Sequence, residues 1–354
     1  MKPALGSVGV FVNCYGCNSA IARAHLDLTF NSAGNCNTHG WLNEKLCVNP
    51  KIDTISRHTS HDDRVLPQED EVTRYRMRRK CLLKWALLLS AVVLLTFLTE
   101  IGGAILLLSV LLVHLAPKRF AYRKAVAVCT FVGMYLVVGL VLAPMLAPIA
   151  GRVALPCFDT ADPGLAALSP LTCLLNRNYV TPATASALHA LSVDLQVTNP
   201  GTSVRYLDAA FPFDLGMPLL PHLSHGDGRK VDLAFFYLGD DLVYKSGLPP
   251  SPIGYWGFEQ PPVGGLQLCT LDTLITLRWN MTWLQSLWPE TGLDHARTRG
   301  MLQWLVGPGR SYGVEKILLE PHLESRLGLH SDLIRFQGCQ AARHDDHLHV
   351  AFAN

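Results

Sequence analysis

Two long apolar runs constrain this 354-residue chain more than any other feature of its sequence. Residues 82–116 are almost wholly apolar, broken mainly by Lys84, Glu100 and His114, and residues 125–149 form a second run. Charged residues make up only 16% of the chain, below the roughly 25% of an ordinary soluble domain. About 20 residues of helix cross a bilayer, so the first run is too long for one comfortable span. The sequence therefore predicts a membrane-embedded region within residues 82–149.

Positive charge decides how many times the chain crosses. One basic cluster at residues 74–80 precedes the first run, and another at 118–124 separates the two runs. Basic loops stay on the cytoplasmic side. A hairpin that turns at residues 100–103 places both clusters there and delivers everything after residue 150 outside. We therefore favour three spans over two, at residues 82–99, 101–116 and 125–148. Glu100 is interpreted as a turn residue, with a buried functional carboxylate as the alternative.

Residues 1–80 show no sustained helical or strand periodicity, and we predict a poorly ordered segment. Met77 opens MRRKCLLKWALLLSAVV, a basic stretch followed directly by an apolar run, which is how a signal anchor begins. The residues before Met77 are thus interpreted as the product of an upstream start. Four cysteines in this segment do not repeat as CxxC…CxxC, which favours unpatterned cysteines over a zinc site. They are Cys14, Cys17, Cys36 and Cys47.

Residues 150–354 suffice for one globular domain. Residue patterns predict helices at 182–197 and 294–306, and strands at 203–208, 231–238, 314–319 and 343–352. Helices come first and between strands without a regular βαβ repeat. This order predicts an α+β fold, a mostly antiparallel sheet with flanking helices, preceded by a transmembrane helical anchor. Residues 247–265, rich in Pro and Gly, are expected to form a surface excursion that either shapes a cleft or is decoration.

Net charge and cysteine content limit the possible partners and the cellular compartment. A net charge of +2, from 30 basic and 28 acidic residues, provides no basic face for nucleic acid. Four cysteines fall within residues 150–354, and outside the cytoplasm they can form two disulfides in any of three connectivities. Reduced thiols are expected only if the membrane topology is inverted. These cysteines are Cys157, Cys173, Cys269 and Cys339.

Two short stretches, 221–232 (PHLSHGDGRKVD) and 344–349 (HDDHLH), hold five of the fourteen histidines and four aspartates. A hydrolytic zinc ion needs three such ligands and an open position. We assign His225, Asp232 and His349 as those ligands. In a terminal strand, alternation places His347 on the same face as His349. The alternative is that His222 and His225 are surface residues, that the His-x-His at 347–349 is structural or adventitious, and that Asp345 and Asp346 are a solvated pair.

The two stretches resemble the motifs of the LAS metallopeptidases, which include D-Ala-D-Ala carboxypeptidases and hedgehog-type domains. The match is closest to the penicillin-insensitive murein endopeptidases, in which His-x-Ser-His precedes a Gly and an Asp, and His-Asp-x-His-x-His closes the domain. The resemblance covers residues 200–354, and Gly226 and Asp227 depart from its pattern. It implies a hedgehog/DD-peptidase-like fold, with Zn²⁺ on His225, Asp232 and His349. It also implies three catalytic or site-lining residues: His347 as base or transition-state stabiliser, with His344 and His222 beside it.

The function expected from these features is a membrane-anchored zinc metallopeptidase that hydrolyses stem or cross-link peptides of peptidoglycan. Its catalytic domain is expected on the periplasmic side of the inner, cytoplasmic membrane. Its partners are then peptidoglycan peptides and the lipid bilayer, without nucleic acid. One alternative is a non-catalytic module that binds cell-wall peptides on the same fold. A weaker one is a membrane assembly protein whose metal site is vestigial.

Overall fold

The computed structural model describes residues 69–116, 122–159, 164–220, 223–265, 268–269, 278, 282–289 and 291–353. The chain divides into two units between Leu88 and Leu89. Most of the predicted N-terminal segment, including its four cysteines, lies outside the described residues. Met77 is described and lies inside the first helix. The described part of the first unit is the beginning of that helix.

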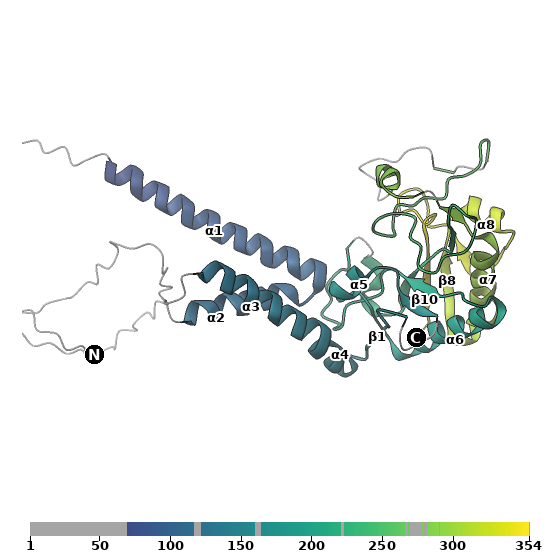
Figure 1. Ribbon diagram of the computed structural model, residues 1–354, viewed down its shortest axis with the longest axis horizontal. Helices are drawn as coiled ribbons and strands as arrows, with labels where there is room; N and C mark the ends of the chain where they lie inside the picture. Colours follow the sequence, from purple (N-terminus) through teal and green to yellow (C-terminus); the bar gives the residue numbers. More distant parts are fainter. Residues whose placement is uncertain are drawn as a thin grey trace, which may run out of the picture. The chain divides into compact units, whose positions relative to one another are not determined.

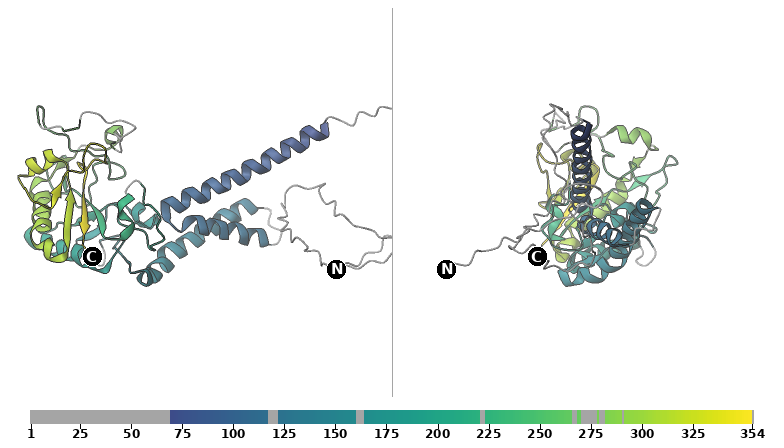
Figure 2. Two further views of the ribbon diagram at one scale, coloured as in Figure 1. Left: turned by 180° about the vertical axis from the view of Figure 1, so that it is seen from behind. Right: turned by 90° about the vertical axis from the view of Figure 1, so that its left-hand side faces the viewer.

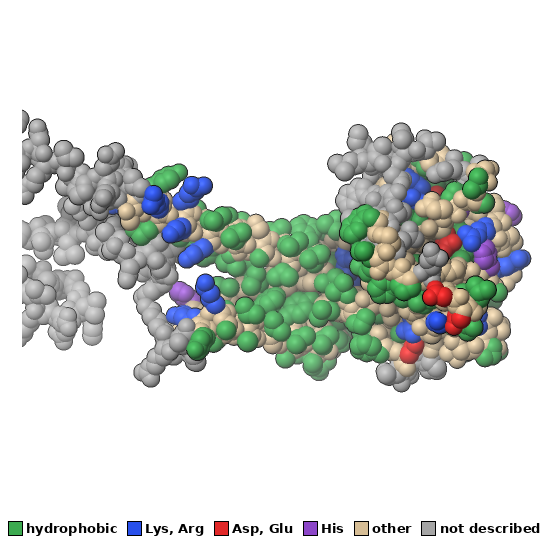
Figure 3. All heavy atoms as spheres, turned by 45° about the horizontal axis from the view of Figure 1, so that its top comes forward, with side chains coloured by type: hydrophobic (Ala, Val, Ile, Leu, Met, Phe, Trp, Pro, Cys, Tyr) green, Lys and Arg blue, Asp and Glu red, His purple; other side chains and the backbone are tan. Residues whose placement is uncertain are grey.

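The apolar runs form helices (Figure 1). Helix α1 spans Glu69–Thr99 and α2 spans Gly102–Leu115, while the third helical stretch runs without interruption to Ala150. That stretch consists of α3 (Arg123–Val137), the π-helical turn η1 (Val138–Leu142), α4 (Ala143–Leu146) and the 3₁₀ turn η2 (Ala147–Ala150). Among the described helices, Thr73–Thr99 and Arg123–Ala150 are long and apolar enough to cross a membrane, and α2 is a shorter apolar helix. Figure 3 shows hydrophobic side chains over most of this helical part.

The predicted turn lies between α1 and α2. Glu100 has a left-handed backbone conformation, with φ of 64°. The Thr99 hydroxyl donates to Leu95 O at 2.7 Å and accepts from Gly102 N at 2.9 Å, which ends one helix and begins the next. A Cβ at Gly102 would lie only 3.3 Å from Leu95 O, so glycine lets the chain turn close to α1.

The domain that follows is built on one six-stranded sheet in the order β2-β4-β5-β10-β8-β9. The inner pairs β4/β5, β5/β10 and β10/β8 are antiparallel, and the outer pairs β2/β4 and β8/β9 are parallel. The mixed, mostly antiparallel α+β architecture is thus confirmed. The strands are β2 (Leu165–Ala167), β4 (Val204–Tyr206), β5 (Lys230–Ala234), β8 (Val314–Leu318), β9 (Ile334–Arg335) and β10 (His347–Phe352).

The predicted strand at 231–238 is split in two. It leaves the main sheet after Ala234, and β6 (Tyr237–Leu238) pairs instead with β7 (Gly292–Leu293). Phe236 N donates to the Thr298 hydroxyl at 3.3 Å, and Phe236 O accepts from Asp294 N at 2.8 Å. The start of the following helix therefore takes the hydrogen bonds that a continuous strand would have used. Another small sheet pairs β1 (Val153–Ala154) with β3 (Tyr179–Val180).

Helices cover one face of the main sheet (Figures 1 and 2). They are α6 (Pro182–Thr198), α7 (His295–Val306) and α8 (Pro321–Leu327). The hydroxyl of Thr181 and the carboxylate of Asp294 cap the first two by accepting from Thr184 N and Arg297 N. Apolar side chains of all three helices pack against alternate residues of β5 and β10, namely Val231, Leu233, Leu348 and Val350. Alternation leaves the opposite face of these strands for Asp232, His347 and His349.

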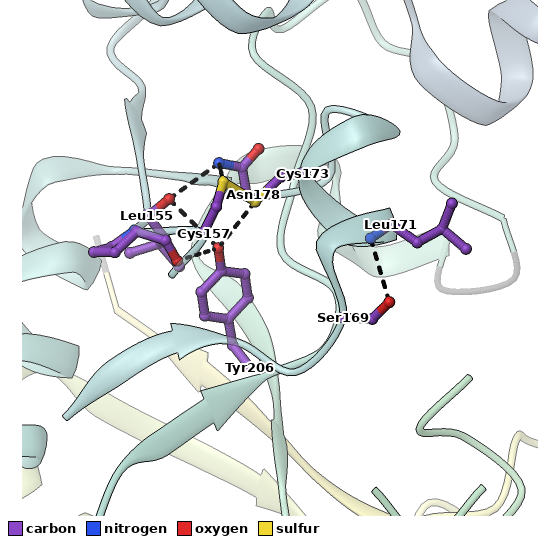
Figure 4. Close-up of a disulfide and its surroundings, with 8 residues drawn as sticks. Leu155, Cys157, Ser169, Leu171, Cys173, Asn178 and Tyr206 are labelled. Carbon is purple, nitrogen blue, oxygen red and sulfur yellow. Dashed lines mark hydrogen bonds between the residues drawn. A yellow bond between two sulfur atoms is a disulfide. The ribbon is translucent and has the colours of Figure 1, made fainter. Parts of the chain in front are cut away.

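Within the described part of the chain, disulfides join Cys157 to Cys173 and Cys269 to Cys339, one of the three connectivities left open by the sequence. Figure 4 shows the first, which ties the segment after β1 to α5 (Pro170–Leu174). The Tyr206 hydroxyl, from β4, lies beside this disulfide and donates to Pro156 O at 2.9 Å. The short helix α5 is thereby fixed to the edge of the main sheet.

Candidate metal centre

The register of the two central strands places two of the assigned ligands opposite each other. Asp232 of β5 is the direct antiparallel partner of His349 of β10. Directly opposed residues have Cβ atoms about 4.5–5.5 Å apart, close enough for one ion. His347 pairs with Ala234, two residues along on the same face. The sequence predicted the alternation, and the structure adds the register.

His225 comes from the loop before β5. It lies in the 3₁₀ turn η3 (Leu223–Asp227), and Gly228, with φ of 70°, returns the chain into the strand. The Arg152 guanidinium donates to Gly226 O at 2.7 Å and fills the space where a Cβ of residue 228 would lie. A glycine is therefore required at 228 for both its backbone conformation and its close contact.

The three ligand atoms converge. His225 Nε2 lies 3.3 Å from Asp232 Oδ1 and 3.1 Å from His349 Nδ1, and the last two atoms are 2.9 Å apart. All three side chains are buried. A tetrahedral zinc ion with bonds of about 2.0–2.1 Å separates its ligand atoms by about 3.3 Å. The donor types, their number and their spacing are compatible with a metal ion such as zinc.

Hydrogen bonds to the outer atoms orient these ligands. His225 Nδ1 is 2.8 Å from Ala209 O, a carbonyl that only accepts, so Nδ1 carries the proton and the Nε2 lone pair faces the cluster. The Tyr255 hydroxyl donates to Asp232 Oδ2 at 2.8 Å and leaves Oδ1 toward the histidines. The three candidate ligands are therefore oriented by contacts behind them, in an arrangement that could hold a metal ion.

The pair of aspartates at 345 and 346 is buried, so the solvated-pair interpretation is wrong. Asp346 Oδ1 lies 2.5 Å from His347 Nδ1, and its Oδ2 accepts from Trp256 N at 2.6 Å. Asp345 pairs with Arg343. His347 Nε2 in turn lies 3.6 Å from Asp232 Oδ1, so this imidazole faces the three ligands.

Burial and the neighbouring carboxylates give the histidines of the cluster different pKa values. Burial alone lowers the pKa of His347, but Asp346 and Asp232 together raise it to about 9. For His349, burial dominates over Asp232 and lowers the pKa to about 4. Burial opposes but does not cancel the effect of Asp232 on His225, whose pKa is raised. Without a bound metal His349 is thus a neutral imidazole near pH 7, while the imidazole of His347 carries a proton.

The structure brings together five of the six predicted site residues. The His344 ring lies 5.2 Å from that of His347 and 5.8 Å from that of His349, measured between centroids. His222 lies outside the described residues. Residue patterns assigned no role to Asp346 or Arg152, and they also missed Tyr255. The available signal was its place in the Pro- and Gly-rich excursion at 247–265, which the structure holds over the site through Tyr255 and Trp256.

Comparison of the sequence with known protein families and with curated proteins finds no match.

Proposed function

We propose that this protein is a membrane-anchored zinc metallopeptidase that hydrolyses stem or cross-link peptides of peptidoglycan on the outer side of the cytoplasmic membrane. The observation that carries the proposal is the convergence of His225, Asp232 and His349, with donor atoms 2.9–3.3 Å apart, beside the buried His347. The two motifs that form this cluster are the ones that resemble the murein endopeptidases. The hedgehog/DD-peptidase-like fold belongs to the same proposal.

Each residue then has a role. When bound by the three ligands, zinc supplies Lewis-acid activation of water and of a peptide carbonyl. His347, fixed by Asp346, presents Nε2 to the site, where a protonated imidazole could donate a hydrogen bond to a developing oxyanion. A neutral His347 could instead act as general base. His344 lines the site beside it.

Two further observations support the outer location. Both disulfides lie in residues 150–354, and disulfides persist in oxidising compartments such as the periplasm. The second is the pair of long apolar helices, together with the basic clusters at residues 74–80 and 118–124. By the positive-inside rule these clusters belong on the cytoplasmic side, which leaves the domain outside.

The test is zinc content and hydrolysis of the detergent-solubilised full chain. We expect one zinc ion per chain, lost in His349→Ala but kept in the matched control His330→Ala, since His330 is exposed on the same domain. The full chain should release new peptide ends from muropeptides, and a chelator should stop the release. Equal zinc in both variants would refute the ligand assignment. Zinc and peptide binding without new ends would instead identify the non-catalytic module.

A further inference from the structure

The third helical stretch has a small-residue face over its last turns. Gly139, Ala143 and Ala147, spaced four residues apart, are buried. Ala143 and Ala147 pack with Tyr179 in an apolar cluster, and a Cβ at Gly139 would lie 3.4 Å from the Asn176 side chain. Small side chains at this spacing let a helix approach its neighbour closely. The domain therefore covers this face of the helix.

The opposite face of the same turns is apolar and uncovered. Val141, Met145 and Ile149 are also spaced four residues apart, and the last two are 70% and 85% exposed. Water is an unfavourable solvent for such a row, because each exposed apolar side chain forgoes about 1.5–3 kcal/mol of burial. Lipid is the solvent that suits it. The bilayer is thus expected to reach Ile149, alongside the part of the helix that the domain covers.

The length of α2 also indicates that the bilayer extends as far as the domain. The fourteen residues of α2 extend about 21 Å, roughly 9 Å short of a hydrocarbon core of about 30 Å. At the turn before α2, Glu100 is only 5% exposed and accepts from Phe213 N at 3.0 Å. Ionisable groups at membrane depth face protein and pair there. A bilayer of ordinary thickness consequently extends past Glu100 and meets the domain.

Helix α5 of the domain is suited to that environment. Leu171 and Leu174 are exposed on it, and the Leu174 carbonyl accepts from the Tyr135 hydroxyl of α3 at 2.6 Å. Asn176 Nδ2 donates to the same hydroxyl at 3.1 Å. In hydrocarbon, backbone carbonyls must find partners within the protein, and this contact provides one. Leu215, two residues beyond the Phe213 contact with Glu100, is 68% exposed.

We infer that Leu171, Leu174 and Leu215 form a rim that lies in the acyl-chain boundary of the same bilayer that holds α2 and α3. The domain is then seated in the outer leaflet instead of standing clear of it on a tether. The contacts of Tyr135 with Leu174 and of Glu100 with Phe213 hold the rim beside the apolar helices, and this proximity selects lipid as the occupant. The inference rests on the membrane part of the proposed function, and it is independent of zinc and of hydrolysis.

The test is photocrosslinking to lipid in the full chain, reconstituted in vesicles of phosphatidylethanolamine and phosphatidylglycerol. p-Benzoylphenylalanine replaces Leu171 or Leu215 at the rim, Val132 on α3 as the membrane reference, or Val197 and Tyr312 as exposed apolar controls elsewhere on the domain. Lipid adducts are counted by mass spectrometry after irradiation. We expect adducts at Leu171 and Leu215 to match those at Val132 and to exceed the two controls by more than about tenfold.

The outcomes separate this inference from the proposed function. Adducts at Val132 alone would overturn the rim and leave the membrane anchor standing. Adducts at none of the positions would overturn both the rim and the anchor. Equal adducts at Leu171 and Val197 would show contact with lipid that is not confined to the rim, and this too would overturn the inference. Zinc content, measured on the same samples, reports separately on the metal centre.

Discussion

Tyr255→Phe tests whether the metal centre depends on contacts behind its ligands. The change removes only the hydroxyl that donates to Asp232 Oδ2 at 2.8 Å. The ring, which packs edge-on against His347 with centroids 5.1 Å apart, stays in place. Hydrogen bonds to charged groups contribute about 1.5–3 kcal/mol. Loss of such a supporting partner typically weakens metal binding by about 10–100-fold, or about 1.4–2.7 kcal/mol, so the two magnitudes agree.

The assay is zinc affinity by chelator competition on the detergent-solubilised full chain. Tyr244→Phe is the matched control, because it removes a hydroxyl that accepts from Ser203 N at 3.2 Å, outside the metal cluster. We expect the zinc dissociation constant to rise about 10–100-fold in Tyr255→Phe and to stay unchanged in Tyr244→Phe. Wild-type affinity in Tyr255→Phe, or an equal loss in both variants, would refute the idea that this hydroxyl orients Asp232.

Three further predictions concern stability. The pKa of His347, raised to about 9 from 6.5, gives the zinc-free chain about 3 kcal/mol that is fully present below pH 6.5 and lost as pH rises through 9. The melting temperature should fall across that window, and His347→Gln should flatten the fall. Gly228→Ala should cost more than Gly201→Ala: both glycines have positive φ, costing about 1–2 kcal/mol, but only the former displaces Arg152. Chemical denaturation compares the two, and equal losses would contradict the contact. Zinc at a hundredfold excess over its dissociation constant should stabilise the chain by about 2.7 kcal/mol, reversibly by chelator; an unchanged melting temperature would argue against a native site.

Local pattern sufficed to predict several parts of the structure. A helix at 182–197 is predicted from its Ala- and Leu-rich composition and a strand at 314–319 from its residue pattern, and α6 and β8 lie there. The alternation of His347 and His349 requires only that HLHVAF be a strand, which it is. Side chains two residues apart share a face whatever the strand pairs with. Such features depend on the backbone of one element, so they can be predicted from the residues of that element alone.

Features that depend on contacts with a second element could not be predicted in this way. The break at Phe236 exists because Thr298 and Asp294, about sixty residues later, take its backbone hydrogen bonds. Tyr255 reaches Asp232 from a stretch whose composition predicts only a loop. The pairing of Cys157 with Cys173 was one of three choices that spacing could not separate. Each case is settled by tertiary packing, which single-sequence periodicity does not contain.

Arg152 shows why the apolar helices and the candidate metal centre are not independent parts. It follows Ala150, the end of the third helical stretch, by only two residues, and its guanidinium holds the carbonyl next to the ligand His225. Position 228 must then be a glycine, because a side chain there would overlap the Arg152 guanidinium. The loop that delivers His225 is therefore built partly from the residue that leaves the last apolar helix. A domain cut at residue 150 keeps all three candidate ligands but loses the helix that positions Arg152, so the geometry of the site belongs to the full chain.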